Sequence, residues 1–343
     1  MKPLILCICL LFPYPPALHA QGADIPLMPY RFGHLWGYAD KAKKVIIRPR
    51  FDFAWPFREG LAMVISGGRY NYVGMAGKLI SPISYQAAGE FNEGLAPVKL
   101  KGAWGYIDKA GRTVIPFEYE SAMQVSEGLS GAKKDGRWGV LDITSKRFTP
   151  TKYDEIFQFS QGLARVKMGG LYGYIDKTGV EAVPPVYEEA FSFQDGFASA
   201  RLRVQYGFIS LETKSFKAKE FFNIGPYTEG LAHAERQLDA SGRCGYIDTE
   251  GVEKIPFSYF MCASFSEGLA PVLKSRNGNI CTGAVTKACD LQKTKWGFID
   301  KTGKEVIPFK YDQVSGFKNG AAKAVLEGKV FYIDSNGAEY FQK

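Results

Sequence analysis

The residues of this chain that could carry catalytic or metal chemistry are few and widely spaced. The chain has three histidines in 343 residues, and two of them, His34 and His233, lie beyond the N-terminal apolar segment. No Ser-His-Asp set, Cys-His metal spacing, phosphate-binding glycine loop or paired-carboxylate signature accompanies them. We therefore expect both histidines to be surface residues or to have their hydrogen bonds satisfied. The sequence predicts no catalytic residue, no metal site and no cofactor.

One acid recurs at regular spacing along the chain. Stacked side by side, such carboxylates could form a row that binds cations, but a cation site needs several oxygen ligands that converge at one point. Aspartate at the start of a tight turn accepts backbone N–H bonds, and repetition favours this structural role. The seven aspartates are Asp40, Asp108, Asp142, Asp176, Asp248, Asp300 and Asp334. The same interpretation applies to Glu59, Glu93, Glu127, Glu229 and Glu267.

Aromatic side chains recur in the same way and offer a second kind of chemistry. Exposed Tyr and Trp at regular spacing could stack on the sugars of a glycan, but residues that are present in every repeat usually build the fold. Trp55 breaks the pattern, since other units have Gly, Met or Phe there, and it is our candidate for an exposed aromatic contact. The aromatics that we interpret as a structural ladder are Trp36, Trp104, Trp138, Tyr172 and Trp296.

These residues belong to a unit that is repeated along the chain with a period of about 34 residues. Its first block reads W-G-Y-I-D-K-x-G, as at 104–111 and 296–303. A second block, F-x-E-G-L-A-x-V, ends each of the first eight copies, and a V-I-P-x-x-Y element lies between the two blocks. The nine copies start at Trp36, Tyr70, Trp104, Trp138, Tyr172, Tyr206, Cys244, Trp296 and Val330.

The unit predicts β-structure, because proline and glycine at fixed places break helix interiors and the apolar residues alternate. In one unit we expect strands at 95–100, 104–108 and 113–116, with 119–127 as a connector. Small isolated sheets are marginal, so neighbouring units must stack. We expect an all-β tandem array of about nine β-meander units over residues 27–341. We favour an open or spiral array over the alternative, a closed propeller-like ring, because propeller blades usually have four strands and no split terminal unit is visible.

The motif W-G-[YF]-I-D-K-x-G, with its E-G-L-A partner, resembles the WG-repeat (KWG-repeat) proteins of bacteria. The resemblance covers nearly all of the chain after residue 26. It implies an all-β repeat architecture and no established catalytic activity. The second and sixth copies depart most from the motif, because Asn71 replaces Gly, Gly74 and Ser210 replace Asp, and residues 214–219 lack the proline. We expect these two units to be distorted.

The first 20 residues are typical of a signal peptide. Lys2 precedes an apolar run at 4–12 that is too short to span a bilayer, and Ala20 is the small residue after which we expect cleavage. Residues 21–26 would form a short lead, and no later segment predicts a membrane span. The mature protein is therefore expected in the periplasm or outside the cell. The net charge of +8 is spread along the chain, which argues against a nucleic-acid partner.

An insertion around 274–293 interrupts the repeat at a hairpin turn. Exported chains with an even number of cysteines favour disulfides, and we predict the pairs Cys281–Cys289, within the insertion, and Cys244–Cys262. Loops on rigid scaffolds commonly carry binding sites, so this basic loop is a candidate contact for an acidic partner. Its bases are Lys274, Arg276, Lys287, Lys293 and Lys295.

Taken together, these features predict an exported, non-enzymatic repeat protein that acts as a binding or structural scaffold. Its partners are expected to be proteins at the cell envelope or outside the cell. The alternative is binding of a glycan or cell-wall polymer through the repeated aromatics.

Overall fold

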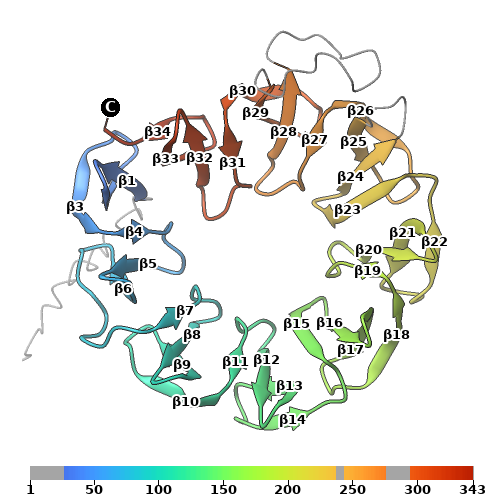
Figure 1. Ribbon diagram of the computed structural model, residues 1–343, viewed down its shortest axis with the longest axis horizontal. Coiled ribbons are helices and arrows are strands. Elements are labelled where there is room, and N and C mark those ends of the chain that lie inside the picture. Colours follow the sequence, from blue (N-terminus) through green and yellow to red (C-terminus); the bar gives the residue numbers. More distant parts are fainter. Residues whose placement is uncertain (1–26, 237–242, 276–293, 343) are drawn as a thin grey trace, which may run out of the picture.

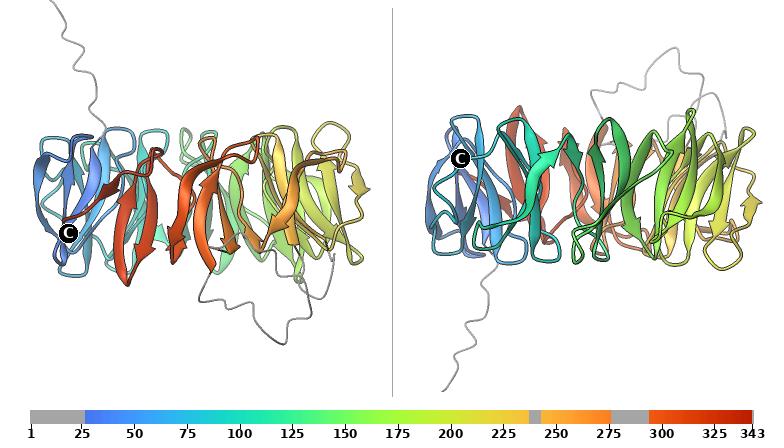
Figure 2. Two further views of the ribbon diagram at one scale, coloured as in Figure 1. Left: turned by 90° about the horizontal axis from the view of Figure 1, so that it is seen from above. Right: turned by 90° about the horizontal axis from the view of Figure 1, so that it is seen from below.

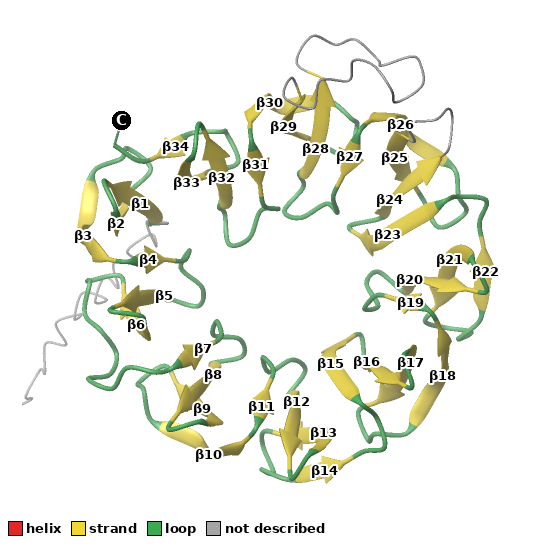
Figure 3. Ribbon diagram, viewed as in Figure 1, coloured by secondary structure: helices red, strands yellow, loops and turns green. Residues whose placement is uncertain are grey.

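The computed structural model describes residues 27–236, 243–275 and 294–342. These residues contain strands and no helix (Figure 3), and therefore no helix that could cross a membrane. The strands form nine antiparallel sheets that stand side by side in a closed ring (Figure 1). Seen from the side, the ring is a flat disc (Figure 2). We number the sheets as blades 1 to 9 in chain order.

The strands of each blade follow one another in sequence, from the innermost to the outermost. The first three blades contain β1 (Met28–Phe32), β2 (Leu35–Ala39) and β3 (Val45–Phe51); β4 (Phe53–Ala54), β5 (Leu61–Ser66) and β6 (Arg69–Gly74); and β7 (Ala87–Ala88), β8 (Leu95–Leu100), β9 (Ala103–Asp108) and β10 (Thr113–Tyr119). Blades 4 to 6 contain β11 (Ser121–Ala122), β12 (Leu129–Lys134), β13 (Arg137–Asp142) and β14 (Phe148–Pro150); β15 (Glu155–Ser160), β16 (Leu163–Met168), β17 (Leu171–Asp176) and β18 (Glu181–Tyr187); and β19 (Glu189–Ala190), β20 (Phe197–Leu202), β21 (Gln205–Ser210) and β22 (Phe216–Ala218). Blades 7 to 9 contain β23 (Asn223–Thr228), β24 (Leu231–Arg236), β25 (Arg243–Ile247) and β26 (Glu253–Tyr259); β27 (Met261–Cys262), β28 (Ala270–Ser275), β29 (Thr294–Ile299) and β30 (Glu305–Tyr311); and β31 (Gln313–Val314), β32 (Ala322–Leu326), β33 (Lys329–Ile333) and β34 (Glu339–Tyr340).

The motif residues of blade 3 show why the sequence folds this way. A Cβ added at Gly105 would lie 2.7 Å from the Ile115 carbonyl oxygen, so the glycine of W-G lets the outer strand β10 approach. Pro116 lies in that outer strand, at the edge of the sheet, where a missing N–H costs nothing. Asp108 accepts backbone bonds from Ala110 and Arg112, both at 2.9 Å. The repeated aspartate therefore closes the turn between the third and outer strands.

The sequence-based prediction of three strands and a connector needs a correction. The segment expected as a connector contains a short fourth strand, β11, which pairs with β12 as the innermost strand of blade 4. Blades 2 to 9 all have this inner strand. Four strands per unit are the number that propeller blades usually have, and the closed ring, not the favoured open array, is the arrangement that forms.

The ring closes where blade 9 meets blade 1, without a blade built from both ends of the described chain. Arg31 and Phe341 form a parallel β-bridge, the amide of Gln342 donates to the Arg31 carbonyl at 2.9 Å, and the Arg31 guanidinium donates to the Val330 carbonyl at 2.9 Å. Closure of this kind leaves no sign in the repeat pattern, which is why a split terminal unit was not visible.

Buried tyrosines and phenylalanines hold neighbouring blades together. The second aromatic of the W-G-Y motif is almost inaccessible, as in Tyr38, Tyr106 and Tyr174 at 0–1% exposure. The first aromatic is less buried: Trp36 is 3% exposed, but Trp104 is only half-buried. Trp138, Tyr172 and Trp296 are half-buried as well. The continuous core ladder is therefore built mainly by the second aromatic.

The repeated Glu-Gly pair forms a second link between blades. Glu93 has a φ of 52° and Gly94 a φ of 79°, the left-handed geometry of a type I′ hairpin turn. The acid side chain then accepts a hydrogen bond from the backbone N–H of the equivalent glycine in the next blade. The pairs are Glu59–Gly94, Glu93–Gly128, Glu127–Gly162, Gln161–Gly196, Asp195–Gly230, Glu229–Gly268 and Glu267–Gly320.

One junction between blades is covalent. Cys244 of β25 and Cys262 of β27 form a disulfide that joins blade 7 to blade 8, which is the pairing expected from the sequence. Cys244 stands at the position of the first motif aromatic. At the equivalent junction between blades 1 and 2, Trp36 packs in one cluster with Ala54, 18 residues later. The disulfide therefore replaces an aromatic contact between blades.

The second unit is distorted, as expected, and the sixth only slightly. Blade 2 lacks a regular outer strand and has isolated bridges at Leu79 and Tyr85 instead. Asn71, in place of glycine, donates from its amide to the carbonyls of Ser81 and Ile83 at 3.0 and 3.1 Å. In blade 6 the outer strand β22 is present but has only three residues.

Candidate binding site at the closure of the ring

A departure from the repeat lies on the inner side of the ring, where residues of blade 9 face residues of blades 2 and 3. A cavity of about 330 Å³ opens there, a size within the range of ligand pockets. Blade 2 contributes Phe53 and Trp55, blade 3 contributes Glu90, and blade 9 contributes Lys318, Lys323, Ser315 and Tyr332. The site thus combines aromatic walls with charged side chains from blades that are far apart in sequence.

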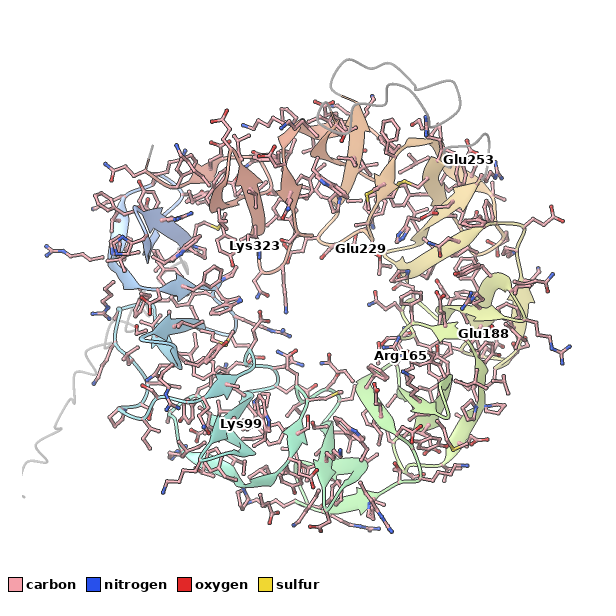
Figure 4. The ribbon with its side chains drawn as sticks, viewed as in Figure 1. Lys99, Arg165, Glu188, Glu229, Glu253 and Lys323 are labelled. Atoms are coloured by element: carbon pink, nitrogen blue, oxygen red, sulfur yellow. A yellow bond between two sulfur atoms is a disulfide. The ribbon has the colours of Figure 1, made fainter. Side chains whose placement is uncertain are left out.

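The charged groups at this cavity are arranged asymmetrically. Glu90 forms ion pairs with Lys318 at 2.6 Å and with Arg58 at 3.2 Å, so its carboxylate is already matched. Lys323 is exposed, lies toward the centre of the ring (Figure 4), and forms no ion pair with a described residue. The cavity therefore presents an unmatched positive charge beside its aromatic walls.

Trp55, the aromatic that breaks the repeat, lies in the wall of this cavity. It is half-buried, and its ring meets that of Phe53 at 4.5 Å in an edge-to-face contact. Its backbone carbonyl accepts the Tyr38 hydroxyl at 2.9 Å. The residue is therefore held by its neighbours on one side and faces the cavity on the other.

Tyr332 forms the floor between blade 9 and blade 1. Its ring packs edge-to-face against Trp36 at 5.7 Å and lies 6.5 Å from Phe53. Burial, together with the nearby Glu90 carboxylate, raises the pKa of Tyr332 above its usual value. The hydroxyl therefore keeps its proton at neutral pH and can donate a hydrogen bond.

Of the five bases of the predicted basic loop, the two that the structure describes, Lys274 and Lys295, do not line the cavity with Trp55. Lys274 and Lys295 pair across β28 and β29 in blade 8. Lys295 forms an ion pair with Asp312, and the Lys274 ammonium lies 5.6 Å from the Phe309 ring centroid. Outside the described residues lie Arg276, Lys287, Lys293 and the predicted Cys281–Cys289 pair.

The two histidines have different surroundings. His34 lies exposed in the turn between β1 and β2. His233, in β24, packs against Gly225, and its Nδ1 has no hydrogen-bond partner among the described residues, so it is not the satisfied side chain that we expected. Burial lowers the pKa of His233 to about 4, which keeps the imidazole neutral at pH 7. Within the described part of the chain, no group of three His, Cys, Asp or Glu side chains is placed to hold a metal ion.

Sequence reasoning found Trp55 but missed Lys318, Lys323 and Tyr332. The signal for Lys323 was absent, because the equivalent residue varies from blade to blade and is Pro97, Arg165 and His233 in blades 3, 5 and 7. Departure from the repeat, the test that singled out Trp55, would not have selected it. The grouping of these residues required ring closure, which the repeat pattern does not show.

Nine four-stranded or three-stranded blades around a common axis define this protein as a β-propeller-like ring. The profile of the WG-containing repeat matches residues 36–70, 72–102, 104–138, 139–172, 172–203, 245–277 and 296–329. These matches span more than half of the chain, and the protein belongs to the WG-containing repeat family.

A match to a crystal structure with a TM-score of 0.60 supports the fold assignment. A crystal structure described as the eukaryotic initiation factor matches with a TM-score of 0.60 at 9% identity, over 93% of this chain and 96% of that chain. Dihydro-heme d1 dehydrogenase NirN in complex with DHE matches with a TM-score of 0.48 at 12% identity, over 87% of this chain and 76% of that chain. At these identities the likeness is one of fold alone. No curated protein matches the sequence.

Proposed function

We propose that this protein is an exported, non-enzymatic scaffold that binds a protein partner at the cavity where the ring closes. The observation that carries the proposal is the grouping of Trp55, Tyr332 and the unmatched Lys323 around one cavity of about 330 Å³. Aromatic and basic anchors in a preformed hollow are the usual centres of protein interfaces. Propeller-like folds commonly serve protein interaction, which agrees with this assignment.

The charge of the cavity indicates the kind of partner. Glu90 is already paired with Lys318 and Arg58, so an incoming acidic side chain would meet Lys323 without displacing another ion pair. Charge complementarity of this kind steers association and selects partners. We therefore infer an acidic contact segment on the partner.

Export is supported by two independent features. Residues 1–20 are typical of a signal peptide, and the Cys244–Cys262 disulfide fits an oxidising compartment. We expect the exported protein to begin at Gln21. Mass spectrometry of protein recovered from the periplasm or medium checks this expectation, and an intact N-terminus that retains Met1 would contradict it.

Charge reversal at the cavity tests the binding proposal. Lys323→Glu is expected to weaken partner capture about tenfold, because attraction becomes repulsion at the binding surface. The measurement is a crosslinking pull-down from native envelope, quantified against the wild-type protein. Lys217→Glu, an equal charge change on the exposed outer strand β22, is the matched control and should capture as much as the wild type. Equal capture by both variants, or no captured protein at all, would contradict the proposal.

Glycan binding is the second candidate, and the position of Trp55 in the cavity wall favours it. An aromatic face beside a cavity can stack on a sugar ring. Purified cell-wall polysaccharide separates the two candidates. Retention that is lost in Trp55→Ala but kept in Lys323→Glu would support the glycan.

A further inference from the structure

Blade 1 lacks, among the described residues, the inner strand that blades 2 to 9 possess. We propose that this inner-strand position binds an extended segment of a partner protein, which completes blade 1 by adding a strand beside β1 and places an aromatic side chain against Tyr332. The inference rests on the proposed function and specifies how the partner is held. The eight complete junctions of the ring show what fills this position elsewhere.

The first unmatched contact is the hydroxyl of Tyr332. Six blades have tyrosine at the second aromatic position of the motif, and in five of them the hydroxyl donates to a carbonyl that follows the inner strand of the next blade. The pairs are Tyr38–Trp55, Tyr72–Gly89, Tyr106–Met123, Tyr174–Phe191 and Tyr246–Ala263. Tyr332 is only 5% exposed, yet no described residue accepts its hydroxyl. Tyr332 borders the cavity, so an incoming carbonyl could accept the hydrogen bond that the other five hydroxyls make within the ring.

The second unmatched contact is aromatic. Two residues after that carbonyl, the next blade inserts a ring against the same motif aromatic at 4.7–5.0 Å. The ring pairs are Tyr38–Phe57, Tyr72–Phe91, Tyr174–Phe193, Tyr246–Phe265 and Phe298–Phe317. For Tyr332 no described residue occupies that place. A second cavity of about 190 Å³ lies near this place, lined by Leu27, Met28, Phe57 and Tyr340 among others.

The third unmatched contact is the backbone edge of β1. In blade 3 the second strand accepts two bonds from the inner segment, from Gln86 to the Lys99 carbonyl at 2.9 Å and from Gly89 to the Pro97 carbonyl at 2.8 Å. In blade 1 the first bond is supplied by Gln342, which donates to Arg31 at 2.9 Å. The carbonyl equivalent to that of Pro97 belongs to Pro29, and no described backbone amide donates to it. Among the described residues, one end of the strand position is therefore anchored by Gln342, and no residue fills the rest.

The two cavities are the two halves of this one position. Asn319 lines both of them. In the intact junctions the same space holds the inner strand, the residue whose carbonyl accepts the tyrosine hydroxyl, and the phenylalanine that follows. Strand addition to an open sheet edge, with pockets for alternate side chains, is an established mode of peptide recognition. Lys323 at the mouth favours an acidic residue near the inserted strand.

The sequence that precedes β1 does not carry the side chains that fill this position in other blades. By the repeat register, residues 21, 23 and 25 correspond to Gly89, Phe91 and Glu93, and they are Gln21, Ala23 and Ile25. Alanine cannot supply the ring that packs on the motif aromatic. The partner segment is therefore expected to carry Phe or Tyr two residues after the residue that accepts the Tyr332 hydroxyl.

Peptide binding to the mature protein tests this inference. The probe is a fluorescent peptide with the sequence of residues 87–92 (Ala-Ala-Gly-Glu-Phe-Asn), which in blade 3 follows the residue equivalent to Gln342. We expect saturable binding by fluorescence anisotropy. Replacing the peptide phenylalanine by alanine should weaken binding about 20-fold, because a buried ring is lost.

Two protein variants distinguish this position from nonspecific adhesion. Tyr332→Phe removes the hydroxyl and is expected to weaken the peptide about fivefold, the effect of one neutral hydrogen bond. Tyr174→Phe is the matched control, since the Tyr174 hydroxyl already donates to Phe191, and it should bind the peptide as the wild type does. Equal affinities of both variants, or no binding of the peptide, would overturn the inference.

Other occupants have their own signatures. A tenfold gain in peptide affinity after deletion of residues 21–26 would assign the position to this chain's own lead. A concentration-dependent doubling of mass that the peptide abolishes would assign it to a second copy. Either result overturns the inference of a partner strand. The peptide could fail to bind while the protein still captures its partner in a way that depends on Lys323. That result would reject strand addition but would leave the proposed function standing.

Discussion

Replacing Tyr106 by alanine is expected to lower the free energy of unfolding by about 3–5 kcal/mol, the usual cost of removing a large buried aromatic. Tyr106 is fully buried in the core between blades 3 and 4. Its hydroxyl lies 2.8 Å from the Met123 carbonyl and 2.5 Å from Ser130 Oγ. The substitution removes both the packing and the polar link between two blades. Urea titration followed by circular dichroism measures the loss.

Two variants separate the contributions at this junction. Tyr106→Phe keeps the ring and should cost about 1 kcal/mol, the net value of a typical hydrogen bond. Trp104→Ala should cost less than Tyr106→Ala, because Trp104 is half-buried. A larger loss for Trp104→Ala would mean that the first motif aromatic, not the second, forms the core between blades.

Removing the disulfide between blades 7 and 8 is the second large expected effect. The Cys244→Ala/Cys262→Ala double variant should lose about 3 kcal/mol in the chain-entropy model for a loop closed over 18 residues. The variant also leaves this junction without the aromatic that other junctions carry, so no packing contact compensates. The measurement is the urea midpoint of the oxidised wild type against that of the double variant.

The Cys281→Ala/Cys289→Ala variant is the matched control. It removes the other two cysteines of the array and leaves the link between blades intact. Reducing agent should lower the urea midpoint of this control toward that of Cys244→Ala/Cys262→Ala, because both proteins then lack the link between blades 7 and 8. If the control keeps the same midpoint with and without reducing agent, the Cys244–Cys262 link does not stabilise the ring.

The sequence predicted the elements of this fold well because each has a local cause. Proline at the outer strand, glycine beside it and aspartate at the following turn act over a few residues, and their repetition fixes the register. The Cys244–Cys262 pair was predicted as the pair left once Cys281 and Cys289 were assigned to the insertion, and the structure shows that it joins two blades. The distortion of blade 2 follows from Asn71, which enters a position where the other strong copies have glycine.

Closure of the ring could not be predicted in the same way. The inner strand of a blade is as short as Ser121–Ala122, and two residues cannot show an alternating pattern. Whether stacked units spiral or close depends on the small rotation from each blade to the next, which no single residue determines. The bridge between Arg31 and Phe341 joins residues that are distant in sequence and lie outside the repeated motif.

The candidate site was only partly predictable for the same reason. Trp55 was recognised because it departs from the repeat, whereas Lys323 stands at a position that varies from blade to blade. Tyr332, in contrast, matches the motif, and its importance lies in the partner it lacks. Only the closed ring shows that Tyr332 lies at a junction where blade 1 offers no described inner strand for it to contact.

Site-specific photocrosslinking tests the central claim most directly. The peptide of residues 87–92 would carry benzoylphenylalanine in place of its phenylalanine and be irradiated with the mature protein. The adducts would be mapped by mass spectrometry. The account predicts adducts at Tyr332 and at the adjoining cavity residues Met28 and Phe57, and competition by unlabelled peptide. Adducts spread over the other blades, or confined to the outer strands, would contradict the claim that blade 1 receives its inner strand from a partner.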